Sequence, residues 1–176
     1  GMVAENGSGS PSDPYAGAYN NTTIETSSDG SYGMYAVSSS RASNYGTIVT
    51  SGDNSHGMVA SDGSWAYNHA DITTNGADAF GMYALNGAGV FNHLGGSILT
   101  SGTDSHGMVA EGVGSTATNE PGAVIRTTSA DSYGMYALDG GQATNLGEVF
   151  TEGLSSHGMY ALDGSIVVNL GTVRTL

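Results

Sequence analysis

The sequence predicts an all-β fold, a parallel β-helix (solenoid) of about seven coils, with ~24 residues and three short strands in each coil. The first observation behind this prediction is a phrase, Gly-Met-(Tyr/Val)-Ala, that recurs along the chain at intervals of mostly 24 to 27 residues. The second is that every methionine occupies the same slot of that phrase: Met2, Met34, Met58, Met82, Met108, Met135 and Met159. Each repeat also contains two further phrases, (Ala/Val)-x-Asn and Gly-x-(Ile/Val)-x-Thr.

The three phrases are too short and too rich in glycine and β-branched residues to form helices. Because successive side chains of a strand point to opposite faces, the repeated Met34 and Ala36 are expected to point inward and Tyr35 outward. The same alternation places Ile48 inward in the third phrase. Arg126 falls where that phrase usually has threonine, which predicts a bulge or a shifted register in its coil.

The residue before each Gly-Met pair is always aromatic or histidine: Tyr32, His56, Phe80, His106, Tyr133 and His157. Stacked rings explain this slot better than metal ligands, because phenylalanine cannot coordinate a metal. The repeated asparagines are expected to form a buried ladder whose amides bond to one another and to the turns. His69 and His93 are expected at the surface, since no third ligand accompanies them.

The composition of the chain argues against a nucleic-acid partner and against membrane insertion. The 176 residues include 16 acids, three arginines and no lysine, which gives a formal net charge of −13. This charge repels phosphate and anionic lipid, so we expect no nucleic-acid partner. No apolar run approaches the ~20 residues of a membrane span, so we expect no direct membrane insertion of this segment. Cysteine is absent.

We expect residues 1–176 to form one β-helical domain of a longer protein, with an irregular insertion over residues 5–17 in the first coil. No catalytic or metal-binding motif is recognisable, and the turn acids recur singly, one per coil. We therefore expect a protein that is not an enzyme, with no catalytic residues, no metal and no cofactor.

Two stretches of the sequence suggest a family. The segments "NYGTIVTSGDNSHGMVA" and "NLGEVFTEGLSSHGMYALDG" resemble repeats in the passenger regions of bacterial autotransporter (type V secretion) proteins. The resemblance covers nearly the whole chain as a style of repeat. It implies a right-handed β-helix, secreted or exposed on the cell surface on the extracellular side of a Gram-negative outer membrane. It also implies that the chain acts as an adhesin in attachment or cell–cell aggregation, a role that contributes to virulence.

Outward aromatic residues are the candidate contacts for such a role. If like positions stack, they form a tyrosine-rich stripe with two neighbours from the second phrase, and the candidate binding residues are Tyr35, Tyr67, Tyr83, Phe91, Tyr136 and Tyr160. The expected partner is a host or bacterial surface glycan or protein, or a second copy of the chain. The alternative is a β-helical polysaccharide lyase or hydrolase, or a phage tailspike segment.

Overall fold

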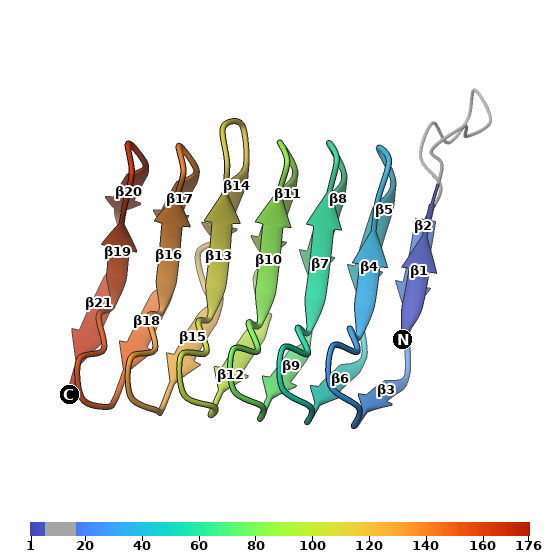
Figure 1. Cartoon of the computed structure of the whole chain (residues 1–176), viewed down its shortest axis with the longest axis horizontal. Coiled ribbons are helices and arrows are strands. Elements are labelled where there is room, and N and C mark those ends of the chain that lie inside the picture. The colour runs from blue at the N-terminus through green and yellow to red at the C-terminus, as the bar shows by residue number, and fades with distance from the viewer. Residues whose placement is uncertain (6–16) are drawn as a thin grey trace.

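The computed structural model describes residues 1–5 and 17–176, which form a parallel β-solenoid of about seven coils (Figure 1). Each coil contributes one strand to each of three parallel sheets, which confirms the predicted fold. The predicted insertion over residues 5–17 lies outside the described residues except for its two ends.

The first phrase forms sheet A, which comprises β1 (Met2–Ala4), β4 (Met34–Ala36), β7 (Met58–Ser61), β10 (Met82–Leu85), β13 (Met108–Glu111), β16 (Met135–Leu138) and β19 (Met159–Ala161). The second phrase forms sheet B, which comprises β2 (Gly17–Asn20), β5 (Arg41–Asn44), β8 (Trp65–Asn68), β11 (Gly89–Asn92), β14 (Thr116–Asn119), β17 (Gln142–Asn145) and β20 (Ile166–Asn169). The third forms sheet C, which comprises β3 (Thr23–Thr26), β6 (Thr47–Thr50), β9 (Asp71–Thr74), β12 (Ser97–Thr100), β15 (Val124–Thr127), β18 (Glu148–Thr151) and β21 (Thr172–Thr175).

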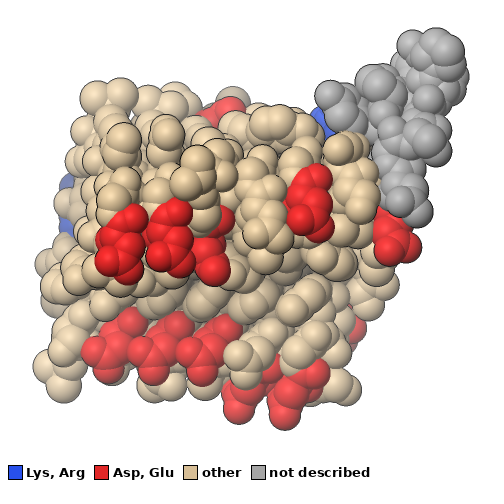
Figure 2. Space-filling view, turned by 45° about the horizontal axis from the view of Figure 1, so that its top comes forward, with Lys and Arg blue, Asp and Glu red and all other residues tan. Residues whose placement is uncertain are grey.

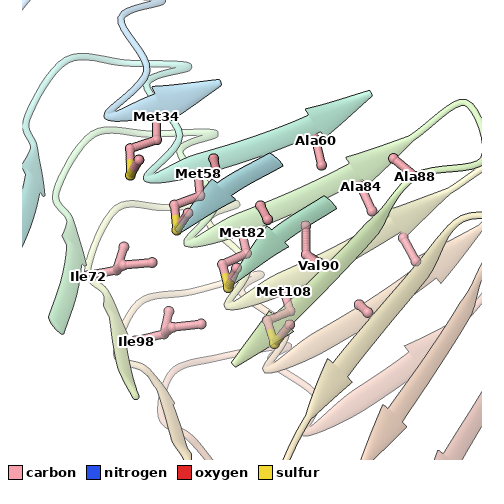
Figure 3. Packing of buried hydrophobic residues seen from close by; sticks show 14 of the residues in the cluster. Met34, Met58, Ala60, Ile72, Met82, Ala84, Ala88, Val90, Ile98 and Met108 are labelled. Atoms are coloured by element: carbon pink, nitrogen blue, oxygen red, sulfur yellow. The ribbon is translucent and has the colours of Figure 1, made fainter. Parts of the chain in front are cut away.

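The core is a set of columns, each made of one inward position repeated in successive coils. The methionines of β4, β7, β10, β13 and β16 are all 0% exposed, and alanines follow them two residues later. Figure 3 shows Met58 and Met82 one above the other, pointing from sheet A toward Ile72 and Ile98 of sheet C. The predicted inward positions of methionine, alanine and isoleucine are confirmed.

The register of sheet C corrects one expectation. Ile98 pairs with Ile125 and Thr100 pairs with Thr127, so Arg126 is an outward residue beside Leu99 and the strand has no shift. The preceding turn is longer in this coil than in most, and Ala123, fully buried, precedes the strand where four other coils have glycine. A longer turn absorbs the extra residues because turn length varies more easily than a paired strand.

The asparagines form a continuous ladder on the inward side of sheet B. The Nδ2 group of each residue donates to Oδ1 of the asparagine in the next coil, at 2.8–2.9 Å, from Asn20 to Asn169. Asn92 also donates to the carbonyl of Gly96 at 3.3 Å, which holds the turn after β11. Both polar ends of a buried amide are thereby satisfied, as the sequence predicts.

Most of the described turns from sheet A to sheet B use two consecutive left-handed residues. Asn86 has φ of 54° and Gly87 of 75°, and Asp139 and Gly140 have 52° and 85°. The sequence suggests positive φ for the glycines, but the preceding aspartate or asparagine adopts it as well. Asparagine and aspartate tolerate this region because their short polar side chains bond locally.

The corner from sheet C to sheet A explains the glycine before each methionine. A β-carbon at Gly81 would lie 2.2 Å from Ile98 Cγ2 and 2.6 Å from the carbonyl oxygen of Gly107. These contacts are far below van der Waals distance, so this corner has no space for a side chain. The invariant glycine thus lets the chain pass close to the isoleucine column.

The ladder leads to a prediction. Replacing Asn92 by aspartate removes the amide donor that meets Asn119 Oδ1 and buries a charge, so we expect a loss of about 3 kcal/mol or more in unfolding free energy at pH 7. Asn169→Asp is the matched control, because Asn169 is exposed and accepts from Asn145. An aspartate there can still accept, so we expect a change within about 0.5 kcal/mol. Urea unfolding followed by circular dichroism measures both, and equal losses would contradict the ladder's role.

Candidate binding surface

The structure divides the six predicted binding residues between two surfaces. Tyr35, Tyr83, Tyr136 and Tyr160 lie on sheet A, and Tyr67 and Phe91 lie on sheet B, which runs behind sheet A in Figure 1. Both sheets turn their inward residues to one shared core. Their outward faces therefore lie on different sides of the solenoid, and the six residues form two groups.

A ring ladder runs along the corner beside sheet A, as predicted. Tyr32, His56, Phe80, His106, Tyr133 and His157 stack in chain order with centroids 4.7–5.4 Å apart and interplanar angles of 18° or less. Three sheet A tyrosines, Tyr35, Tyr83 and Tyr136, meet this ladder edge-on, as Tyr83 does with Phe80 at 5.4 Å and 89°. Stacked and edge-to-face rings at these distances attract one another.

In the outward column of sheet A, the tyrosines pack over the smaller residues of the same column. Val59 is 3% and Val109 is 1% exposed, although both occupy the outward column that Tyr35 and Tyr136 share. Each valine lies beside tyrosines of the adjacent coils. The rings of these tyrosines pack against the ladder and cover the valine. The Tyr35 hydroxyl lies 2.9 Å from Ser61 Oγ, and the Tyr83 hydroxyl donates to the Glu111 carboxylate. These tyrosines are engaged within the fold.

His56 and His106 do more than supply rings. Nδ1 of His56 accepts from the backbone N–H of Phe80 at 3.0 Å, and Nδ1 of His106 accepts from that of Tyr133 at 3.0 Å. Both histidines are 8% exposed, and burial lowers the pKa of each to about 4. They are therefore neutral at pH 7, as a nitrogen that accepts a hydrogen bond must be.

Sheet B carries a second aromatic cluster on its outward face. Tyr67 stacks on Phe91 with centroids 5.3 Å apart, and Trp65 meets Phe91 at 5.9 Å. The guanidinium carbon of Arg41 lies 4.5 Å from the centre of the Tyr67 ring, a cation–π contact, and Arg41 Nε donates to Ser43 Oγ at 3.2 Å. Trp65 and Arg41 extend the site that the sequence predicted, and their rarity was the available signal, since tryptophan occurs once in the chain.

A column along the edge of sheet B completes this cluster. His69 stacks between Tyr45 and His93 with centroids 4.5 Å from each, and His93 also stacks on Tyr67 at 5.4 Å. His93 Nδ1 lies 2.5 Å from Glu120 Oε2. Burial, together with nearby His93 and Arg41, lowers the pKa of His69. Both histidines are half-buried at the surface, where the sequence placed them, but in a ring stack.

The sheet B platform, as we name it, consists of outward residues from β5, β8 and β11 and the turns that follow these strands: Arg41, Tyr45, Trp65, Tyr67, His69, Phe91 and His93. It is a continuous set of ring contacts that comes from three adjacent coils. The coils hold it rigidly, because strands above and below pair with each of these strands.

Charged residues elsewhere lie in repeated positions. Figure 2 shows acidic side chains gathered in rows along the solenoid, and equivalent turns hold Asp78, Asp104 and Asp131, all exposed and at positive φ. Within residues 1–5 and 17–176, no three histidine or acidic side chains are grouped as metal ligands would be. The same part of the chain has no helix long and apolar enough to cross a membrane.

The coils and the stacked columns define a parallel β-solenoid domain. More particularly, the chain belongs to the family described as the BigA third pectate lyase-like domain, whose model matches residues 15–175. No curated protein and no solved structure gives a significant match to the chain.

The buried histidines predict acid sensitivity. A histidine with a pKa of about 4 when folded and 6.5 when unfolded leaves stability unchanged above pH 6.5. Below pH 6.5 the unfolded chain binds the proton first, so each histidine removes up to about 3 kcal/mol as the pH falls from 6.5 to 4.

The variant His106→Phe separates the two roles of this ring. Phe80 shows that the slot accepts phenylalanine, but the Tyr133 N–H loses its acceptor, so we expect about 1–2 kcal/mol less stability at pH 7.5. Near pH 4.5 the variant escapes the protonation penalty, and we expect it to be the more stable protein. Urea unfolding across this pH range measures the difference, and a difference that does not vary with pH would show that His106 is not held neutral.

Proposed function

We propose that this chain is an adhesive and structural segment of a BigA-type surface protein, carried as an autotransporter passenger on the extracellular side of a Gram-negative outer membrane. The family match supports a surface protein, and the repeats resemble those of autotransporter passengers. The observation that carries the adhesive role is the sheet B platform, a half-buried aromatic cluster at the surface of a rigid stack of coils.

The composition of the platform supports binding as its role. Tryptophan, tyrosine and arginine are the residues that contribute most to binding energy at interfaces, and here they lie together. Tyr45 is 48% exposed and Leu94, next to His93, is 74% exposed. The partner we propose is a glycan or protein of a host or bacterial surface, or a second copy of the chain.

We also propose that the segment acts by binding and not by catalysis. A lyase that acts on uronates needs cations to neutralise its substrate. This chain has only three arginines and a net charge of −13, and Arg126 is neutralised by Glu152 at 2.5 Å. The acids of the turns recur from coil to coil, and this repetition distinguishes no pair of them.

Adhesion can be tested with substitutions that the fold already contains. Thr118 and Thr144 occupy the same column as Tyr67 and Phe91, so the double variant Tyr67→Thr/Phe91→Thr keeps residues that this column accepts. We expect beads coated with the variant to bind host epithelial cells, or one another, at least tenfold less than beads coated with the unmodified chain, because the central rings of the platform are lost.

The matched control is Val49→Thr/Leu99→Thr on the outward face of sheet C, where Thr73 occupies the same column. We expect this variant to adhere normally. Equal adhesion of both variants and the unmodified chain would refute the proposed surface. Cleavage of a polysaccharide by the unmodified chain, seen as new reducing or unsaturated ends, would favour the enzymatic alternative.

A further inference from the structure

The outward face of sheet B holds its tryptophan against the sheet. A β-carbon at Gly89 would lie 2.6 Å from Trp65 Cε3 and 3.0 Å from Phe91 Cε2. The indole of Trp65 therefore occupies the space over Gly89, where the next coil has no side chain. This arrangement places Trp65 beside Phe91 in one layer of rings instead of letting it project from the surface.

The rings of this layer overlap only in part. Ring atoms in contact are about 3.5–4 Å apart. The Tyr67 and Phe91 centroids are 5.3 Å apart in nearly parallel planes, so the two rings are offset by about 4 Å. The Tyr67 ring is also covered in part by the guanidinium of Arg41, and Trp65, Tyr67 and Phe91 all remain half-buried, so each still presents some of its surface to solvent.

A cationic donor and a carboxylate acceptor lie at the two sides of the platform. Arg41, which only donates, lies over Tyr67, and Glu120, which accepts when ionised, lies beside His93. They come from β5 and from the turn after β14, three coils apart, or about 14 Å along the axis. A hydroxyl group both donates and accepts, so a ligand rich in hydroxyls can use both ends.

Beyond the rings, the same face continues with uncharged polar side chains. The outward positions of β14 and β17 are Thr116, Thr118, Gln142 and Thr144. They lie in register with Trp65 and Tyr67, in the same two columns. The aromatic cluster thus leads into a row of hydroxyl and amide groups.

We propose that this face binds an uncharged polysaccharide chain, whose sugar rings lie against Trp65, Tyr67 and Phe91 and whose hydroxyls bond to Arg41, Glu120 and the threonine row. The proposal rests on the adhesive function above and names its ligand class. Sugar rings have apolar C–H faces that fit aromatic surfaces, and their rims of hydroxyls fit the surrounding polar groups. An anionic polymer such as pectate fits poorly, because the chain carries a net charge of −13.

Trp65 is the only tryptophan of the chain, so its fluorescence reports on this face alone. We would titrate the whole chain with dextran, mannan and polygalacturonate in 0.15 M salt and follow Trp65 emission. We expect a saturable change with a neutral polymer, and binding of polygalacturonate at least tenfold weaker. Tyr67→Thr should weaken neutral-polymer binding at least tenfold, whereas Leu99→Thr on sheet C should change it less than twofold.

The result that overturns the inference is no change in Trp65 emission with either neutral polymer, or equal binding of polygalacturonate. If Tyr67→Thr/Phe91→Thr nevertheless abolishes adhesion, the adhesive function stands and its partner is a protein. If a neutral polymer binds in a Tyr67-dependent way while adhesion is unaffected by the double variant, the glycan site stands and the proposed adhesive function fails.

Discussion

The structure depends on parallel, in-register pairing between coils. Backbone hydrogen bonds run along the solenoid axis and place each residue above its counterpart in the next coil, as with Met58 above Met34 and Met82 above Met58. Neighbouring strands are about 4.8 Å apart, so every inward position must suit a copy of itself at that distance. Methionine, isoleucine and asparagine satisfy this requirement by packing or by bonding to one another.

This constraint makes polar columns possible inside a thin core. A single buried asparagine would leave amide groups unpaired, but in a column each amide donates to the next and the turn carbonyls accept the remaining hydrogens. Such a network is stable when every member is satisfied and costly when one is not. The ladder therefore ties each turn after sheet B to the coils on both sides, and specifies the register as strictly as the apolar columns do.

The residues that point into the core were predictable from the sequence. The burial and the mutual positions of the outward residues were not. Met34, Ala36 and Asn92 recur with a strict period, so alternation alone gives their direction. Val59 has the period of an outward residue, yet it is buried because tyrosines of adjacent coils and the ring ladder cover it. Arg126 was misplaced because turn lengths vary between coils while strand pairing does not. The separation of Tyr67 from Tyr83 depends on the angle between sheets, which the repeat does not encode.

A repeat that determines the interior leaves function to positions that depart from it. Outward columns accept tyrosine, valine, threonine or arginine, because pairing places no requirement on a side chain that points to solvent. Departures clustered in adjacent coils can therefore create a surface without cost to the stack. In this chain Arg41, Trp65 and Gly89 are such departures, and they follow one another in a single column. Gly89 has no side chain and so leaves space for the indole of Trp65 beside Phe91, and Arg41 places its guanidinium over Tyr67. The rest of the solenoid serves as the rigid support that holds them in register.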